Sequence, residues 1–538
     1  MIKKAAIFIV IVIFLALSLP YIHNPGLNID EADKAITCDM MFKNTSTVPR
    51  DVLAGHHITL FNRFVPTMAS PYSGRIHVYI MYIFSRLFGV NVFSLRFSSI
   101  AVSAFTLYFI YLLCRMWFGY RVAVITALLT ATSLFFVQYA RVGHYREVVF
   151  VMFFFWAGFF LIGRYLRERK FYLLCLGFFL FGLGLTTKIT MLFYLAGLSI
   201  SFILLNRKFN LLSGINIKYA FLALISFCVG SFYLILYNVL SGWGTFKLLS
   251  DSLMNTSSRY NNLSYIANLQ ERIGHLMELL RGHLSDGDRA DWGVTEWHFA
   301  ESAAPVLVAL FFVSFIFVFL YMFFLKGKIE KHKIIFFLIF YGAVFFLTPF
   351  TISGSNPGHL LLLFPFPQLI MALFIDYIWT KSRDKRVTFG LFSFFLMPFL
   401  TFHIAENIRF HKEMERNGGC RRWSSAIYEL SDYLREKEIS SPVTFGFGLC
   451  HNIAFLSKYK AIPNQLDENY SLEDIEKEYR RQSLKNEPIF FLTKGSEDCM
   501  PNLNLFIKLA EKDGKNKKLY KIFYNRAGEP VYWLYKIY

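Results

Sequence analysis

Long apolar runs separated by short polar connections dominate the chain. Runs of near-spanning length occupy approximately residues 5–20, 97–114, 122–138, 148–163, 171–187, 189–205, 219–240, 303–325, 334–350, 360–380 and 387–404. A run of about 20 apolar residues is long enough to cross the hydrocarbon core of a bilayer as a helix. The pattern predicts a polytopic α-helical membrane protein with about 11 transmembrane helices. The first is expected to remain uncleaved, because no small-x-small cleavage site follows it.

The segment from Ile76 to Val90 is apolar but short, and Arg86 interrupts it. Its status decides the orientation of every later helix. If it does not cross, the basic connections at 115–121, 164–170, 207–218, 326–333 and 381–386 all fall on the N-terminal, cytoplasmic side. If it crosses, each of them violates the positive-inside tendency. We therefore expect a juxtamembrane or re-entrant amphipathic helix on the outer face.

This topology predicts two domains. Residues 1–404 would form the transmembrane catalytic domain, with outer loops at 21–96 and 241–302 and a short outer turn at 139–147. Residues 405–538 have ordinary soluble composition and would form an α/β domain outside the membrane. Within it, 423–437 has the pattern of an amphipathic helix, 442–447 and 488–492 that of strands, and 520–535 that of a hairpin turning at Arg526-Ala527-Gly528.

Composition supports the membrane class. Of the 538 residues, 55% are hydrophobic, 19% aromatic and only 17% charged, which lies outside the soluble globular range. The formal net charge of +19 would suggest nucleic-acid binding in a soluble protein. Here the basic residues gather in short loops, where they set orientation, and no basic surface interleaved with aromatic residues is visible. Seven cysteines show no metal-binding spacing.

An acidic pair, Asp30 and Glu31, follows the first apolar run by about ten residues. Both could simply begin a helix, since 32–42 is amphipathic and acidic residues favour a helix N-terminus. Their position beside a membrane surface also suits acid–base chemistry on a lipid-borne substrate.

Cations occur at the same predicted membrane face. The short turn between two apolar runs contains Arg141 and Arg146, followed by the acidic Glu147. Lys188 lies between two further runs, and His359 begins another. Ionisable groups at membrane depth are costly unless they line a cavity. The alternatives are a snorkelling lysine and an interfacial histidine.

The long outer loop at 241–302 offers weaker candidates. Arg259 and His283 stand among its mixed charges, which are usually solvated surface. A divalent metal site built from His283, Asp288 or His298 remains an open alternative, because the spacing does not indicate a tight ligand set.

Taken together, carboxylates and cations on one membrane face are what glycosyl transfer from a phosphate-linked donor requires. A base removes the proton of the acceptor hydroxyl, and cations stabilise the departing phosphate.

The chain resembles the polyisoprenyl-phosphate-sugar glycosyltransferases of the GT-C fold, the superfamily of the protein O-mannosyltransferases and the lipid A aminoarabinose transferase. The resemblance covers roughly residues 1–400. It rests on Asp30-Glu31, Leu87-Phe88-Gly89 with Arg96, the turn 139–147, Thr187-Lys188, and the span entered at His359 with Pro365.

The resemblance implies Asp30 as catalytic base, with Glu31 beside it, and Lys188 in the donor cavity. In the family a lysine before the juxtamembrane helix meets the donor phosphate, whereas here the stretch is 70–77 and Arg75 would serve instead. Glu147 would match an acidic residue of the family.

We therefore expect an integral membrane enzyme, in a bacterial plasma membrane, that moves a sugar from a polyprenyl phosphate to a hydroxyl of a lipid, glycan or protein with inversion. Arg75, Arg141, Arg146, Lys188 and His359 would bind the donor phosphate. The rival interpretations are a transporter or lipid flippase, which should show repeats and broken mid-membrane helices, and a non-enzymatic scaffold.

Overall fold

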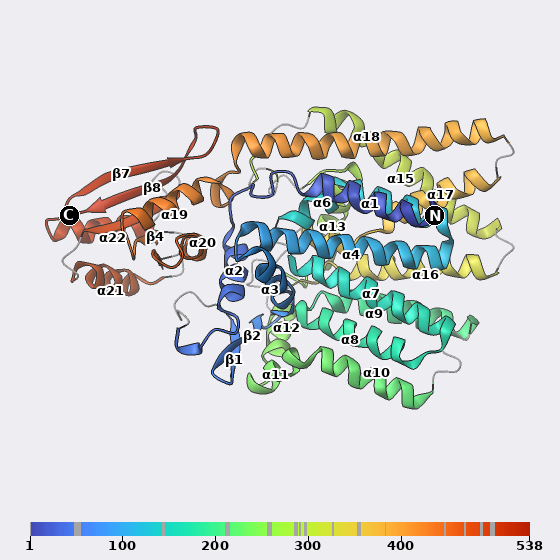
Figure 1. The fold of residues 1–538 in the computed structure, drawn as a ribbon, viewed down its shortest axis with the longest axis horizontal. Coiled ribbons are helices and arrows are strands. Elements are labelled where there is room, and N and C mark those ends of the chain that lie inside the picture. Colours follow the sequence, from blue (N-terminus) through green and yellow to red (C-terminus); the bar gives the residue numbers. More distant parts are fainter. Residues whose placement is uncertain are drawn as a thin grey trace.

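The computed structural model describes residues 2–47, 55–142, 146–209, 216–254, 261–284, 289, 292–294, 298–324, 328–351, 357–381, 384–445, 448–466, 470–484, 488–494 and 501–538. A long bundle of helices forms one end of the molecule, and a smaller α/β domain forms the other (Figure 1). The N-terminus lies at the far end of the bundle, and the C-terminus lies in the α/β domain.

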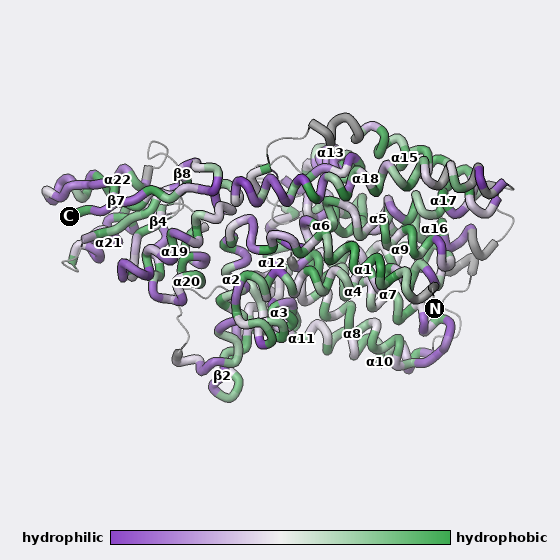
Figure 2. Tube along the Cα trace, turned by 45° about the horizontal axis from the view of Figure 1, so that its top comes forward, coloured by the Kyte–Doolittle hydropathy of each residue, from purple (hydrophilic) through white to green (hydrophobic). Residues whose placement is uncertain are grey.

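The bundle consists of helices that coincide with the apolar runs of the sequence. They are α1 (Ile2–Ser18), α4 (Val92–Phe118), α5 (Tyr120–Thr132), α6 (Leu134–Arg141), α7 (Arg146–Glu168), α8 (Phe171–Thr187), α9 (Met191–Phe209), α10 (Ile217–Gly230), α11 (Phe232–Leu240), α15 (His298–Phe324), α16 (Lys328–Leu347), α17 (Phe366–Lys381) and α18 (Lys385–Asn417). Helix α7 packs between α4 and α8, α8 packs on α10, and α9 packs on α16. Figure 2 shows the bundle as predominantly hydrophobic and the α/β domain as more hydrophilic.

Length and hydropathy qualify several of these segments as membrane spans. Among the described residues, four are long and apolar enough to cross a bilayer, and two bent helix pairs raise that number to six. Four shorter apolar helices, at Ala5–Ser18, Ile76–Phe88, Phe171–Thr187 and Met191–Leu205, fall below that length. The chain is thus an integral membrane protein of several spans, and the number eleven stays a prediction.

Two of the predicted spans are broken, which the sequence analysis did not expect. Helices α5 and α6 meet at 61°, and α10 and α11 meet at 67°. At the first break the His403 ring accepts a hydrogen bond from the Leu134 N–H at 3.3 Å, and Asn407 donates one to the Thr132 carbonyl at 3.0 Å. At the second, the Thr186 hydroxyl donates to the Gly230 carbonyl at 3.1 Å. Side chains of neighbouring helices therefore satisfy the backbone groups that each bend releases.

The described residues of the connections that carry the basic clusters lie at the end of the bundle remote from the α/β domain (Figure 1). Two contacts join helix ends there: Arg121 pairs with Asp376 at 2.6 Å, and Lys333 donates to the Trp117 carbonyl at 2.7 Å. These connections thus share one end, as the charge pattern predicts.

A layer of short elements separates the bundle from the α/β domain. It contains α2 (Ile29–Met40), the 3₁₀ turn η1 (Thr45–Thr47), a small antiparallel sheet of β1 (His56–Leu60), β2 (Arg63–Ser70) and β3 (Ser73–Gly74), and α3 (Ile76–Phe88). Helices α12 (Gly244–Met254) and α13 (Tyr265–Arg281) and the 3₁₀ segment η4 (Pro357–Leu363) complete it. Helix α3 is the predicted juxtamembrane helix, and it lies at the end of the bundle that faces the α/β domain (Figure 1).

The C-terminal α/β domain is built around a five-stranded sheet of order β5-β4-β6-β8-β7. Its strands are β4 (Val443–Phe445), β5 (Asn464–Leu466), β6 (Ile489–Lys494), β7 (Lys517–Tyr524) and β8 (Pro530–Ile537), and its helical elements are η5 (Arg421–Trp423), α19 (Ala426–Glu436), α20 (Cys450–Leu456), α21 (Leu472–Ser483) and α22 (Pro501–Lys512). The β7–β8 pair is the predicted hairpin. Helix α18 runs without interruption from the bundle to Asn417, where this domain begins.

Candidate active site between the bundle and the α/β domain

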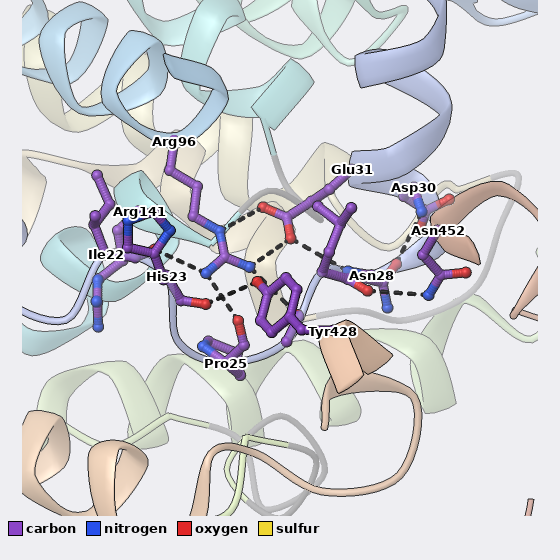
Figure 3. A network of polar contacts seen from close by, with 12 residues as sticks. Ile22, His23, Pro25, Asn28, Asp30, Glu31, Arg96, Arg141, Tyr428 and Asn452 are labelled. Carbon is purple, nitrogen blue, oxygen red and sulfur yellow. Dashed lines mark hydrogen bonds and ion pairs between the residues drawn. The ribbon is translucent and has the colours of Figure 1, made fainter. Parts of the chain in front are cut away.

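A buried arginine fixes the loop that leads to the acidic pair (Figure 3). Arg96 of α4 donates to the carbonyl oxygens of Ile22 and Pro25, each at 2.9 Å, and to that of Gly26 at 3.3 Å. It also forms a bidentate ion pair with Glu31 at 3.0 and 2.7 Å. A guanidinium presents five donors in a rigid fork. One side chain can therefore hold both the loop and the start of α2.

Glu31 is committed to this network. It is fully buried, and it also accepts the Asn28 N–H at 3.3 Å, completing a capping box with Asn28 at the N-terminus of α2. Both carboxylate oxygens are thus occupied by donors of the fold. These contacts favour a positioning role over the catalytic role expected from the sequence, and we propose the former.

Arg141 is drawn into the same region (Figure 3). Its guanidinium donates to the carbonyls of Pro20 and Tyr21 at 2.8 Å each and contacts the His411 ring nitrogen at 2.8 Å. It is 1% exposed. The sequence analysis expected it at the donor phosphate, whereas its contacts are those of a clamp on the first loop.

A second group of charges gathers one turn further along α2. Lys34 pairs with Glu147 of α7 at 2.9 Å, and both side chains are largely buried. The ring of His77, at the start of α3, lies 4.0 Å from the same carboxylate. Burial lowers the pKa of Lys188, the negative charges of Glu147 and Asp30 oppose this shift, and Lys34 adds to it. Asp30, Lys34, Glu147 and Lys188 therefore share one electrostatic environment.

The Thr-Lys link between α8 and α9 is fastened to the β2–β3 turn. Residues Ser73 and Lys188 form an antiparallel bridge, and the Ile189 N–H donates to the Tyr72 carbonyl at 3.0 Å. Gly74 lies so close to α8 that a Cβ there would collide with the Thr186 carbonyl oxygen. Glycine permits this approach, which places the Tyr72 side chain beside Lys188.

A cavity of about 360 Å³ opens at this junction. Its polar lining includes Tyr72, Lys188 and His359, and its remaining wall is largely apolar. The full lining is Tyr72, Lys188, Ile189, Thr190, Leu192, Phe193, Ala196, Leu249, Ser252, Leu253, Asn262, Leu347, Phe350, Thr351 and His359. Burial raises the pKa of the Tyr72 hydroxyl, and the charges of Glu147 and Asp30 raise it further. The charge of Asp30 thus acts on two of the side chains that line this cavity, Tyr72 and Lys188.

Asp33, one turn after Asp30, binds Arg75. The guanidinium of Arg75 is 1% exposed and meets both carboxylate oxygens of Asp33, at 2.5 and 3.0 Å. This pair neutralises much of the charge that the sequence analysis assigned to phosphate binding.

The α/β domain contributes His451, at the start of α20, to the same neighbourhood. Burial lowers the pKa of His451, whereas the charges of Asp33 and Asp30 raise it and Arg75 lowers it. Helix α20 packs directly on α2, and Asn452 donates to the Leu27 carbonyl at 3.0 Å (Figure 3). Sequence reasoning missed His451, Lys34 and His77, because each stands in an ordinary amphipathic or mixed segment and no motif marks it.

The remaining predicted residues are less informative. Arg259, Asp288 and the side chains of Arg146 and His298 lie outside the described residues. His283 follows α13, where the neighbouring Gly282 packs against the ring of His403 in α18. Within the described part of the chain, no group of three or more His, Cys, Asp or Glu side chains could hold a metal ion.

Comparisons with known proteins identify relatives of this architecture. A family model described as dolichyl-phosphate-mannose-protein mannosyltransferase matches residues 75–233. A search of curated proteins gave no match.

Among solved structures, the chain is similar to ArnT from Cupriavidus metallidurans bound to undecaprenyl phosphate. The identity is 14%, the TM-score is 0.59, and the alignment covers 99% of this chain and 97% of that one. It is also similar to the archaeal oligosaccharyltransferase AglB from Archaeoglobus fulgidus in complex with an inhibitory peptide and a dolichol-phosphate. There the identity is 13%, the TM-score is 0.52, and the coverage is 91% of this chain and 69% of that one. At these identities the likeness is one of fold.

Proposed function

Because the chain has the GT-C fold, as the sequence predicts, we propose that it is a membrane glycosyltransferase that moves a sugar from a polyprenyl-phosphate donor to an acceptor hydroxyl. The observation that carries this proposal is the cavity of about 360 Å³ lined by Lys188, the side chain on which the charges of Glu147 and Asp30 act. Its cationic and hydrogen-bonding groups would contact the phosphate of such a donor, and its apolar walls would contact the prenyl chain.

In this proposal Lys188 and His359 bind the donor phosphate. Both line the cavity, and the lysine supplies a positive charge where negative charge develops on the leaving group. Leu192 and Phe193 of α9 and Leu253 of α12 form part of the wall that would accept the prenyl chain. The ArnT structure, described as bound to undecaprenyl phosphate, supports a donor of this class.

Asp30 would act as the general base. It removes the proton of the acceptor hydroxyl as the hydroxyl oxygen bonds to the anomeric carbon, and the bond from that carbon to the phosphate oxygen breaks. The polyprenyl phosphate leaves with the electron pair of that bond, and the single in-line displacement inverts the anomeric centre. Lys188, on which the charge of Asp30 acts, would in turn favour the ionised form of that carboxylate.

Glu147 would organise the cations rather than react. Its carboxylate holds Lys34 at 2.9 Å, and its charge acts on Lys188. Without this carboxylate, two ammonium groups would face each other in a poorly solvated site.

The test is turnover of a radiolabelled polyprenyl-phosphate sugar by purified protein in lipid nanodiscs, with native mass spectrometry of bound undecaprenyl phosphate alongside. Asp30→Asn should bind the lipid as the wild type does and lose about two to four powers of ten in rate. Asp376→Asn, at the opposite end of the bundle, is the matched control and should keep full turnover. Normal turnover by Asp30→Asn would refute the proposed base.

A transporter or lipid flippase is the second candidate, favoured by the two broken helix pairs, which are common in transporters. Movement of fluorescent polyprenyl phosphate between the leaflets of proteoliposomes, without sugar transfer, would select that candidate. For either function we propose a bacterial plasma membrane, with the cavity and the α/β domain on its outer side.

A further inference from the structure

The α/β domain contains a second, larger cavity, of about 810 Å³. It is lined by Ser440, Ser441, Cys450, His451, Tyr459, Lys460, Ile462, Pro463, Asn464, Gln465, Leu466, Tyr470, Asp474, Lys477, Glu478 and Arg481. Its volume lies within the range of about 300–1,000 Å³ that small-molecule sites occupy. None of these residues is part of the donor cavity.

This second cavity borders the proposed reaction centre. His451 lines it, and the charges of Asp30 and Asp33 act on His451. Nδ1 of His451 is buried and has no hydrogen-bond partner in the part of the chain that the structure describes. Tyr459, another lining residue, donates a hydrogen bond to Asp39 of α2 at 2.9 Å. The cavity therefore adjoins the helix that carries Asp30.

The chemistry of the lining indicates which ligand it suits. Three cationic side chains, Lys460, Lys477 and Arg481, are set against two carboxylates, Asp474 and Glu478. The Arg481 guanidinium pairs with Glu478 at 2.9 Å, so part of this charge is already balanced. Two lysines then remain against Asp474, which is a small cationic excess rather than the cluster of cations that would select an anionic lipid headgroup, and an apolar chain would require an apolar wall.

The lining also contains neutral groups that donate and accept hydrogen bonds, namely Ser440, Ser441, Asn464 and Gln465, in addition to the charges of helix α21. A sugar hydroxyl both donates and accepts hydrogen bonds, so a polyhydroxylated ligand can satisfy such a lining. The rings of Tyr459 and Tyr470 offer apolar faces for the sugar ring.

From these observations we propose that the second cavity is the acceptor site of the glycosyltransferase proposed above, and that the acceptor it holds is a short oligosaccharide. The sugar that receives the transfer extends past His451 toward Asp30, while the rest of the oligosaccharide occupies the cavity. In this proposal the α/β domain binds and selects the acceptor, and the bundle binds the donor.

The test uses two consecutive arginines of α21. Arg481 lines the cavity and pairs with Glu478, whereas Arg480 is absent from the lining and pairs with Glu476. Both side chains are more than half exposed, 55% and 73% respectively, so either substitution should leave the fold intact. Arg481→Ala and Arg480→Ala are therefore a matched pair.

Fluorescently labelled full-length protein in nanodiscs is applied to an array of defined bacterial surface oligosaccharides and, in parallel, to an array of 12-residue peptides. The wild type and Arg480→Ala should bind one set of oligosaccharides equally. Arg481→Ala should bind them about tenfold more weakly, as expected for one charge-assisted hydrogen bond.

Three results would overturn the proposal: no oligosaccharide binds, both arginine variants lose binding alike, or the protein prefers peptides. A preference for peptides would indicate that the edge strand β5 pairs with an extended chain. Undecaprenyl phosphate binding, measured by native mass spectrometry, separates this proposal from the proposed function. Arg481→Ala should bind that lipid as the wild type does, and failure of the wild type to bind it would count against the donor site alone.

Discussion

Two adjacent acids, Asp30 and Glu31, should respond in opposite ways to the same chemical change. In Glu31→Gln the carboxylate that pairs with Arg96 at 3.0 and 2.7 Å becomes a neutral amide. The guanidinium would remain 1% exposed with its charge uncompensated, and the amide NH₂ would face its N–H groups. Breaking a buried ion pair on one side costs about 3–5 kcal/mol.

We expect the low end of that range, about 3 kcal/mol, because three backbone carbonyls still accept hydrogen bonds from Arg96. Scanning fluorimetry of the detergent-solubilised protein should show Glu31→Gln unfolding at a lower temperature than the wild type. Asp30→Asn should lower the unfolding temperature less than Glu31→Gln does, since the Asp30 backbone N–H makes the capping contact with Asn28 at 2.9 Å and is unchanged in this variant.

Activity completes the comparison. The turnover that Glu31→Gln retains should rise toward the wild-type value when the assay is run well below its unfolding temperature, whereas that of Asp30→Asn should stay low at every temperature. A Glu31→Gln protein that is as stable as the wild type and yet inactive would refute the positioning role and return Glu31 to the chemistry.

Three further predictions concern the donor cavity and the bundle. Lys188→Met should weaken undecaprenyl phosphate binding, measured by native mass spectrometry, by about 10- to 100-fold, and Lys188→Arg should recover part of it. Burial lowers the pKa of Lys188, so wild-type binding should also weaken as the pH rises through that lowered pKa and the ammonium loses its proton. Gly74→Ala should also reduce lipid binding, because the new methyl group would push the β2–β3 turn away from the Thr186 carbonyl. The control variant Gly514→Ala lies in the α/β domain and should leave lipid binding unchanged. Asn407→Leu removes the side chain that donates a hydrogen bond to the Thr132 carbonyl at 3.0 Å, at the α5–α6 break. The free energy of unfolding should fall by about 1–3 kcal/mol, which scanning fluorimetry would detect as a lower unfolding temperature. Unchanged stability would show that the break does not depend on α18.

The sequence predicted the helices well and their bends poorly. Each apolar run corresponds to a helix because burial in lipid or against other helices requires continuous apolar surface. The break at Ser133 has no proline or glycine beside it. It depends on His403 and Asn407, about 270 residues later in the chain, and no local pattern can reveal such partners.

The structure brings some of the predicted site residues together and separates others. Lys188 and His359 do line one cavity, as charges placed at span ends suggested. Arg141 and Glu147, only six positions apart, face different neighbours: Arg141 clamps the first loop, and Glu147 pairs with Lys34. Sequence spacing gives the depth of a charge in a membrane protein, whereas helix rotation and the break at α5–α6 decide what the charge meets.

The C-terminal α/β domain helps to hold the loop before Asp30. The Gly26 N–H donates to the Trp423 carbonyl at 2.6 Å, and the Tyr428 hydroxyl donates to the His23 carbonyl at 3.0 Å. These partners lie about 400 positions later in the chain than the loop itself. Folding of the α/β domain is therefore linked to the position of the loop that leads to Asp30, and a chain truncated before residue 423 would lack both of these contacts.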